Sequence, residues 1–140
     1  MEAKLKKYTY FFTKVPSTSK NIIVIESSTG KKYSETLFLC TTICGRMFLP
    51  TSKKENDDVY SILGRIGVSS KSAWLRISDE GKEGSWRDVE NNTLVNFTNW
   101  YSGQPNGKRD SNEDYAKLDT DGKWWDTTPT TSSTIVCELP

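Results

Sequence analysis

Oxygen-bearing side chains gather in one polar stretch of the chain, residues 100–126. Gln104 and Asn106 flank a proline, Glu113 and Asp114 follow a turn, and Asp126 comes directly after paired tryptophans. Carboxylate and amide oxygens, with no soft donor among them, are the ligands that Ca²⁺ takes, six to eight at a time and often from loops. The stretch therefore predicts a calcium site.

The composition excludes several classes of function. The chain has 140 residues, enough for one domain with a core of its own. Its 19 basic and 18 acidic residues leave a formal net charge of +1, so we expect neither nucleic acid nor an anionic membrane as a partner. Because the chain has no histidine, Ser-His-Asp and Cys-His catalysis and His-ligated zinc are excluded. An opposed carboxylate pair of the glycosidase kind is not indicated either, so we expect no enzyme.

Three cysteines, Cys40, Cys44 and Cys137, predict one disulfide bridge and one free thiol. A bridge from Cys137 to a cysteine near position 40 would stabilise the fold by roughly 4 to 5 kcal/mol in the chain-entropy model. Such a bridge favours an oxidising compartment, and the acceptor triplets that begin at Asn91 and Asn96 agree with secretion. No apolar run is long enough to span a membrane. We therefore expect a secreted protein.

Residues 1–15 show the spacing of a coiled-coil seam. Apolar residues recur at alternating intervals of four and three, and Pro16 then ends the pattern. This spacing predicts a helix that associates with other copies, most readily as a homo-trimer; the alternative is one amphipathic helix packed on its own domain. The seam positions are Met1, Leu5, Tyr8, Phe12 and Val15.

The rest of the chain, residues 16–140, predicts two helices followed by short strands. A continuous apolar run predicts a strand at 21–28, and helical spacing predicts a helix from Ser34 to Gly45. Ser52 begins a capping box, and Val59, Ile62, Leu63 and Ile66 form the apolar face of a second helix. Strands are predicted at 73–77, 85–88, 115–118, 123–125 and 134–138. This order describes an α+β domain.

The motifs within this α+β pattern resemble a C-type lectin-like domain over essentially the whole chain. Within that family the chain looks most like a collectin carbohydrate-recognition domain with its neck helix. The most specific pieces are Gln104-Pro105-Asn106, Asn112-Glu113-Asp114, Trp124-Trp125-Asp126 and the closing segment 136–140, with Trp74-Leu75-Arg76-Ile77 similar to the core strand of the family. The resemblance implies two helices and antiparallel strands with long calcium-binding loops, preceded here by the coiled-coil helix. It also implies that Cys40 pairs with Cys137 and leaves Cys44 free.

The resemblance further implies two calcium sites. Vicinal sugar hydroxyls would complete the coordination of the principal ion and hydrogen-bond to its ligands. The side chains at the principal-site positions are Gln104, Asn106, Glu113 and Asp126, and those at the auxiliary-site positions are Asp79, Glu83, Glu113 and Asp114.

Three departures from the family pattern bear on these sites. Trp125 stands where the family has a ligand asparagine, and an indole has an N–H donor and no oxygen for a metal. Trp125 therefore either weakens the principal site or serves as an aromatic platform for a sugar, while Trp124 suits the core. Tyr115 and Pro129 stand at the cysteine positions of the family's inner disulfide, so we expect packing and metal to hold the binding loops. The loop 107–112 carries Lys108 and Arg109, which could reach a phosphate or sulfate on an acidic glycan or could be plain surface charges.

These observations together predict a secreted, Ca²⁺-dependent lectin for terminal sugars. Gln104 is similar to the galactose-type motif and Asn106 to the mannose-type, so the predicted preference is mixed. Recognition of microbial glycans in innate immunity is one use that the collectin resemblance implies. The alternative is a lectin-like domain that binds a protein or another surface without metal, and Trp125 is the residue that favours it.

Overall fold

The computed structural model describes residues 8–27, 31–68, 71–107 and 112–140. Two helices and short antiparallel strands make up the fold, as the sequence predicts for an α+β domain. No helix in these described ranges is long and apolar enough to cross a bilayer. In chain order the elements are β1 (Tyr8–Lys14), β2 (Asn21–Ser27), α2 (Tyr33–Thr42), β3 (Arg46–Met47), α3 (Lys53–Arg65), β4 (Ala73–Ser78), β5 (Arg87–Asp88), β6 (Tyr115–Leu118), the short 3₁₀ turn η1 (Thr120–Gly122), β7 (Trp124–Thr127) and β8 (Ile135–Glu138).

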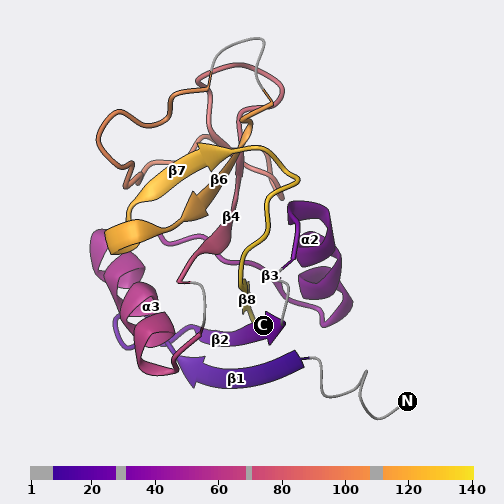
Figure 1. Cartoon of the computed structure of the whole chain (residues 1–140), viewed down its shortest axis with the longest axis vertical. Helices are drawn as coiled ribbons and strands as arrows, with labels where there is room; N and C mark the ends of the chain where they lie inside the picture. Colours follow the sequence, from indigo (N-terminus) through magenta and orange to yellow (C-terminus); the bar gives the residue numbers. More distant parts are fainter. Residues whose placement is uncertain (1–7, 28–30, 69–70, 108–111) are drawn as a thin grey trace.

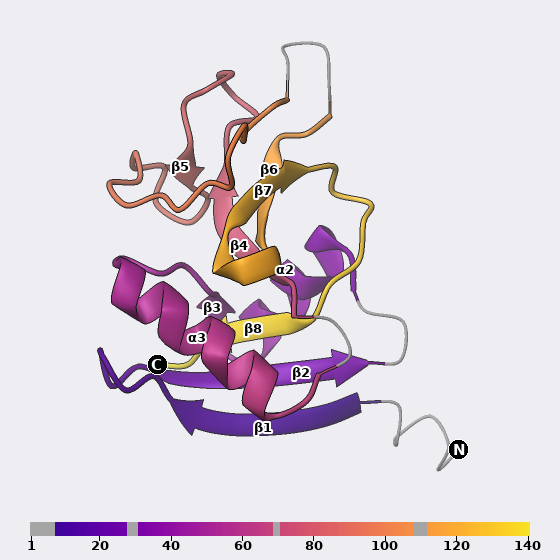
Figure 2. The ribbon, with the colours of Figure 1, turned by 60° about the vertical axis from the view of Figure 1, so that its left-hand side comes forward.

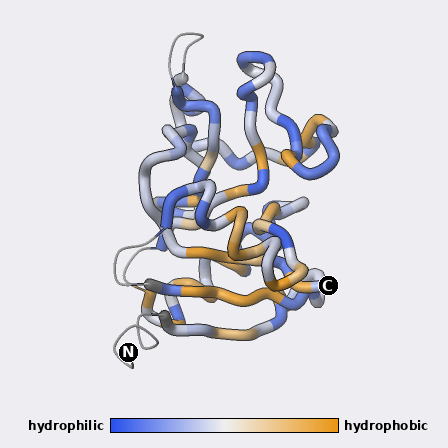
Figure 3. The backbone as a smooth tube through the Cα atoms, turned by 90° about the vertical axis from the view of Figure 1, so that its right-hand side faces the viewer, coloured by the Kyte–Doolittle hydropathy of each residue, from blue (hydrophilic) through white to orange (hydrophobic). Residues whose placement is uncertain are grey.

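The strands form two four-stranded sheets. The lower sheet has the order β1-β2-β8-β3 and the upper sheet the order β5-β4-β6-β7. Figure 1 shows one sheet above the other, with α3 and α2 on opposite sides and the long loops at the top; Figure 2 shows α3 running across the lower sheet. Hydrophobic segments concentrate in the lower half of the molecule, while the upper loops are mainly hydrophilic (Figure 3). The core therefore lies below the polar loops and supports them.

The N-terminal segment is a strand where the seam spacing predicts a coiled-coil helix. β1 pairs antiparallel with β2 over seven residues, from Tyr8 opposite Ser27 to Lys14 opposite Asn21. Its aromatic and β-branched residues suit a pleated surface, and they alternate between the core side, where Phe11 packs, and solvent, where Phe12 is 70% exposed. The helix prediction is wrong for the described residues, and the trimer loses the seam on which it depended; Met1 and Leu5 lie outside those residues.

Both internal helices form close to their predicted positions. Ser52 caps α3 as predicted, because its hydroxyl accepts the Glu55 amide at 3.2 Å. The Glu55 carboxylate bonds the Thr51 amide instead of closing the predicted box on Ser52. The helix buries Val59, Ile62 and Leu63. α2 begins one residue before Ser34, since Lys32 is its N-cap.

The disulfide between Cys40 and Cys137 confirms the predicted pairing. It joins α2 to β8 across a sequence separation of 97 residues, with the two Cα atoms 5.4 Å apart. Cys40 and Cys137 are fully buried, and the remaining cysteine, Cys44, is a free and exposed thiol. The closed loop contains α3 and the whole upper sheet, and a bridge restricts the unfolded chain more strongly the longer its loop is.

A buried ionic network joins the two sheets, and the sequence analysis did not anticipate it. Arg76 of β4 is 5% exposed, and its guanidinium donates to Asp88 Oδ1 at 3.1 Å and to Glu138 Oε1 at 3.4 Å. The same side chain reaches the Met47 carbonyl at 2.6 Å. Glu138 also accepts the Leu49 amide at 3.0 Å. Its carboxylate therefore connects β8 of the lower sheet to β4 of the upper sheet and to the segment that precedes α3.

Replacing Asp88 by asparagine tests this network. D88N keeps the size of the side chain but removes the charge that faces the buried Arg76, and removing one partner of a buried pair costs about 3 to 5 kcal/mol. The matched control is D57N, which breaks the exposed i,i+4 pair of Lys53 and Asp57 and is expected to cost less than about 0.5 kcal/mol. Urea unfolding of both variants measures the difference. Equal losses would show that the buried Arg76 does not need the charge of Asp88.

Candidate functional site

The acidic residues meet because strand β4 of the upper sheet ends next to the point where strand β6 begins. β4 and β6 are antiparallel with Ser78 opposite Tyr115, so the residue after β4 and the residue before β6 are neighbours. These residues are Asp79 and Asp114, and the Asp79 amide donates to the Asp114 carbonyl at 3.1 Å. The Ser78 hydroxyl donates to the same carbonyl at 2.7 Å. Sheet register, not closeness in sequence, therefore brings the two carboxylates together.

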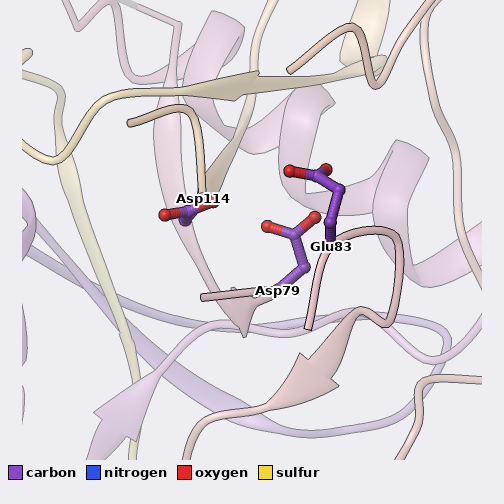
Figure 4. Close-up of side chains that lie close together, drawn as sticks. All are labelled: Asp79, Glu83 and Asp114. Carbon is purple, nitrogen blue, oxygen red and sulfur yellow. The ribbon is translucent and has the colours of Figure 1, made fainter. Parts of the chain in front are cut away.

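Asp79, Glu83 and Asp114 form the first acidic group. Each offers a carboxylate oxygen that lies within 4.8 Å of the others. Figure 4 shows the three side chains turned toward a common space, with Glu83 presented by the loop that follows β4. The Gly84 amide donates to Asp79 Oδ2 at 2.9 Å, while Asp79 Oδ1 is buried and has no hydrogen-bond partner among the described residues. Three of the four predicted auxiliary-site residues are thus together.

The electrostatics of this group favour a cation. Burial and then the neighbouring Glu83 raise the pKa of the Asp79 carboxyl above its usual value. Burial and then Asp79 do the same to the pKa of Asp114. Both shifts report negative charges held close together with too little solvation. A hard divalent cation would relieve this repulsion and would occupy the unpartnered oxygen of Asp79, so the donor set fits Ca²⁺.

A second group forms around Asp126, which is 5% exposed in β7. Its carboxylate accepts the backbone amide of Asn106 at 3.1 Å and that of Gly107. A Cβ on Gly107 would lie 2.7 Å from Asp126 Oδ2 and 3.0 Å from the Glu113 carbonyl, so only glycine allows this approach. Burial and then Asp126 raise the pKa of the Glu113 carboxyl. Asp126, Glu113 and the loop that carries Asn106 therefore come together.

Gln104 belongs to the same loop, two residues before Asn106. A cis peptide joins it to Pro105, and its backbone amide donates to the Tyr101 carbonyl at 2.8 Å. Its side-chain Oε1 is buried and lacks a hydrogen-bond partner among the described residues. A buried amide oxygen without a donor is costly, and a cation or a ligand hydroxyl would satisfy it. The oxygens of this second group fit Ca²⁺ as well, although Asp126 already accepts two amides.

Trp125 stacks on Tyr101, a residue that the sequence analysis missed. The two ring centroids are 4.5 Å apart at an interplanar angle of 20°. Trp100 and Trp124 form an isolated parallel bridge, so the next residue of each segment, Tyr101 and Trp125, falls side by side. The repeated aromatic pairs at 100–101 and 124–125 were the signal that could have found this contact. Trp125 is half-buried, so it neither points freely outward nor fills the core.

Trp124 is the core tryptophan, as the sequence analysis expected. It is fully buried, and its indole N–H donates to Asn56 Oδ1 at 2.7 Å. The Phe97 ring packs edge-on against it at 5.7 Å. Successive side chains of a strand point to opposite faces. Trp124 therefore packs in the core, while Trp125 stacks on Tyr101.

Tyr33 bridges the two positions where the family has its inner disulfide. Its backbone amide donates to the Pro129 carbonyl at 3.3 Å, and its ring lies 4.3 Å from that of Tyr115. The Tyr115 hydroxyl donates to Glu80 at 2.6 Å, which ties this cluster to the loop that presents Asp79 and Glu83. Burial and then Glu80 raise the pKa of Tyr33 to about 12, so its hydroxyl stays neutral. Lys108 and Arg109 lie outside the described residues.

These features define a class of protein: a disulfide-closed α+β domain that displays oxygen-rich loops for binding. The chain belongs to the C-type lectin family, because the profile described as "Lectin C-type domain" matches residues 29–139. The C-type lectin domain is a non-enzymatic binding fold.

Individual relatives agree with this assignment. A perlucin-like protein of Mytilus galloprovincialis is 29% identical over 111 residues, which are 79% of this chain and 66% of that protein. The carbohydrate-recognition domain of the mouse scavenger receptor C-type lectin superposes with a TM-score of 0.73 at 21% identity, covering 91% of this chain and 93% of the other. That of cow CD23 has a TM-score of 0.66 at 20% identity, covering 94% and 87%. The two solved structures show that the fold is shared, and none of the three matches supports the narrower collectin resemblance.

Replacing Asp79 by asparagine tests the first acidic group. Because the pKa of Asp79 is raised in the folded state, its carboxyl costs nothing below its ordinary pKa near 4 and destabilises the calcium-free fold as pH rises through the raised value. D79N is therefore expected to unfold at a higher temperature than wild type in chelator at pH 7, and at an equal temperature at pH 3.

Calcium should reverse this order. At about one hundred times its dissociation constant, calcium would stabilise wild type by about 2.7 kcal/mol, and D79N should lose most of that gain. The matched control is D121N, which removes an exposed carboxylate outside the group and should respond to calcium like wild type. Equal calcium stabilisation of D79N and wild type, measured by thermal unfolding, would contradict this assignment.

Proposed function

We propose that this chain is an extracellular domain that binds terminal sugars of glycans with the help of Ca²⁺. The observation that carries the proposal is a pair of buried oxygens, Asp79 Oδ1 and Gln104 Oε1, that have no donor among the described residues. Each belongs to a group of carboxylate or amide oxygens on the loops of a carbohydrate-recognition fold. The disulfide between Cys40 and Cys137 supports the extracellular placement.

In this proposal Gln104, Asn106, Glu113 and Asp126 hold the principal ion, and Asp79, Glu83, Glu113 and Asp114 hold the auxiliary one. When bound, calcium would supply open coordination positions for two vicinal sugar hydroxyls. The chain's own residues orient the sugar: Asn106 is exposed, and Asp126 fixes its loop by accepting two backbone amides. Because Glu113 and Asp114 are consecutive, ordering of one group constrains the other.

The stack of Tyr101 and Trp125 supplies the apolar contact of the proposed site. Tyr101 is 38% exposed, and its backbone amide donates to the Trp124 carbonyl at 2.9 Å, which holds it at the strand. An aromatic ring that is backed by a second ring is a rigid, apolar surface for the C–H face of a pyranose. Gln104 is similar to the galactose-type motif and Asn106 to the mannose-type, so we propose broad monosaccharide recognition, microbial glycans included. Contacts of Lys108 and Arg109 with an acidic glycan belong to the same proposal.

One relative supports a sugar ligand. The cow CD23 domain has been solved in the presence of the oligosaccharide GlcNAc2Man3. This chain shares its fold with a TM-score of 0.66. A likeness at 20% identity supports the shared fold alone. The proposal that this chain binds a sugar therefore depends on the residues described above.

The alternative is a lectin-like domain that binds a protein or another surface without metal. Two observations favour it. Trp125 offers no oxygen to the principal ion, and Asp126 already accepts the amides of Asn106 and Gly107. In that case the loop that carries Asn106 and Gly107 would form the binding surface together with the aromatic stack of Tyr101 and Trp125, without a metal ion.

Retention on sugar resins separates the two functions. Wild type should be retained on mannose or galactose resin in millimolar calcium and released by chelator. E113Q, which removes one charge of the principal group, should elute early, while the control E90Q changes an exposed glutamate outside both groups and should behave as wild type. Retention that ignores chelator on both resins would overturn the metal-bridged proposal. No retention on either resin, together with no heat from calcium alone in calorimetry, would favour the alternative.

A change at Tyr101 tests the aromatic contact. Y101A should bind monosaccharide about five- to tenfold more weakly, which corresponds to the loss of one aromatic contact of roughly 1 kcal/mol, and Y101F should bind as wild type. Y10A is the matched control, because Tyr10 is an exposed tyrosine on the distant strand β1. Calcium affinity should be the same in all three. Undiminished sugar binding by Y101A would remove Tyr101 from the site.

A further inference from the structure

The acceptor triplet at Asn91 lies in a tight turn that its own residues build. The Asp88 amide donates to the Thr93 carbonyl and the Asn92 amide donates to the Asp88 carbonyl, both at 2.8 Å. The Asp88 carboxylate also accepts the Glu90 amide at 2.9 Å. Asn92 takes the left-handed conformation, φ 59°, which asparagine tolerates better than most residues. All of these bonds lie within residues 88–93. The turn is also anchored to β4, because the Val89 amide donates to the Arg76 carbonyl at 3.1 Å and the Asp88 carboxylate pairs with the Arg76 guanidinium.

Within this turn the side chains of Asn91 and Thr93 are in direct contact. Asn91 Oδ1 accepts the Thr93 hydroxyl at 2.6 Å and the Thr93 backbone amide at 3.0 Å. Both residues are exposed. The carboxamide oxygen is thus engaged by the hydroxyl two residues further on, and the amide nitrogen, the atom that receives a sugar, has no bond to any described residue. This is the hydroxyl-to-asparagine spacing that the acceptor triplet requires.

The second triplet, at Asn96, is held quite differently. Its middle residue, Phe97, is partly buried and packs edge-on against Trp124 of the core. The preceding residue, Val95, pairs its amide with the Trp86 carbonyl at 3.1 Å. No hydrogen bond joins Asn96 to Thr98 in the part of the chain that the structure describes. The conformation around Asn96 therefore depends on tertiary packing, and folding draws its centre inward.

Exposed apolar side chains flank the Asn91 turn on both sides. Val89 is 38% exposed and Leu94 is 57% exposed. Water contact with such groups is unfavourable in proportion to their exposed area, and the C–H face of a sugar attached at Asn91 would cover part of it. The turn therefore offers both a free amide nitrogen and neighbouring surface for the first sugar residue.

We propose that Asn91 carries an N-linked glycan and that Asn96 remains unmodified. In the transfer, Asn91 Nδ2 forms a bond to the sugar C1 and loses one proton, while the C1–O bond to the donor breaks. The donor is a lipid-linked oligosaccharide pyrophosphate, and the lipid pyrophosphate is the leaving group. This inference rests on the extracellular placement in the proposed function and is independent of calcium and sugar binding.

Secretion of the full chain from insect cells behind a cleavable leader tests the proposal. Wild type should carry one glycan by intact mass, and peptide-N-glycosidase should remove it and convert Asn91 to aspartate. N91Q and T93A should each lose the glycan completely, whereas the matched variant N96Q should keep it. Formation of the bridge between Cys40 and Cys137 in each variant, measured by peptide mapping, shows that the chain has folded.

The possible results divide cleanly. Wild type without a glycan, a glycan that persists in N91Q, or a second glycan at Asn96 would each overturn the proposal. Glycan mass is read without any sugar or calcium ligand. Failure of the lectin proposal on sugar resins would therefore leave this result unaffected, and an unmodified but sugar-binding chain would overturn only the glycan.

Discussion

The buried carboxylate of Glu138 is the interaction on which the rest of the structure depends. It is 3% exposed, yet it binds Arg76 of the upper sheet, the Leu49 backbone amide, and Lys20 at 3.1 Å. A charge in this position is stable only when all its partners stay in place, since removing one leaves a desolvated ion. The neighbouring residue, Cys137, anchors the disulfide. Two consecutive residues of β8 thus fix α2, both sheets and the loop before α3, and the direction in which β4 leaves the core follows.

The direction of β4 brings the acidic loops together, and the closeness of their carboxylates is energetically unfavourable. The end of β4 and the beginning of β6 lie side by side, which places Asp79 next to Asp114. Burial and the neighbouring carboxylates raise the pKa values of both residues. The loops that carry them lack the inner disulfide of the family, and Tyr33 replaces it with a ring contact to Tyr115 and a hydrogen bond to Pro129. Packing of this kind holds the base of the loops but does not neutralise their charge. A cation would neutralise this charge. We therefore expect calcium binding and the ordering of these loops to be coupled.

Much of the fold could be predicted from the sequence where local signals act alone. Ser52 capped α3, and the apolar run at 21–28 formed β2, because capping and burial of β-branched residues need little help from distant parts of the chain. The helix prediction for the N-terminal segment was wrong because it also relied on a local signal alone. Spacings of four and three between aromatic residues suit a helix seam, but the partner strand β2 lies alongside and pairs all seven residues, and this pairing outweighs a periodicity only two heptads long.

The sequence by itself determined which atoms are available: the oxygen donors of the loops, the three cysteines, the paired aromatics and the acceptor triplets. Only the tertiary structure decided which of them meet. It grouped Asp79 with Asp114 through strand register, set Tyr101 against Trp125 through the bridge of Trp100 and Trp124, and made Arg76 an internal ion rather than a surface one. The physical reason is that these contacts join residues far apart in the chain. Their geometry is set by how the sheets pack around a buried charge, and no local pattern records it.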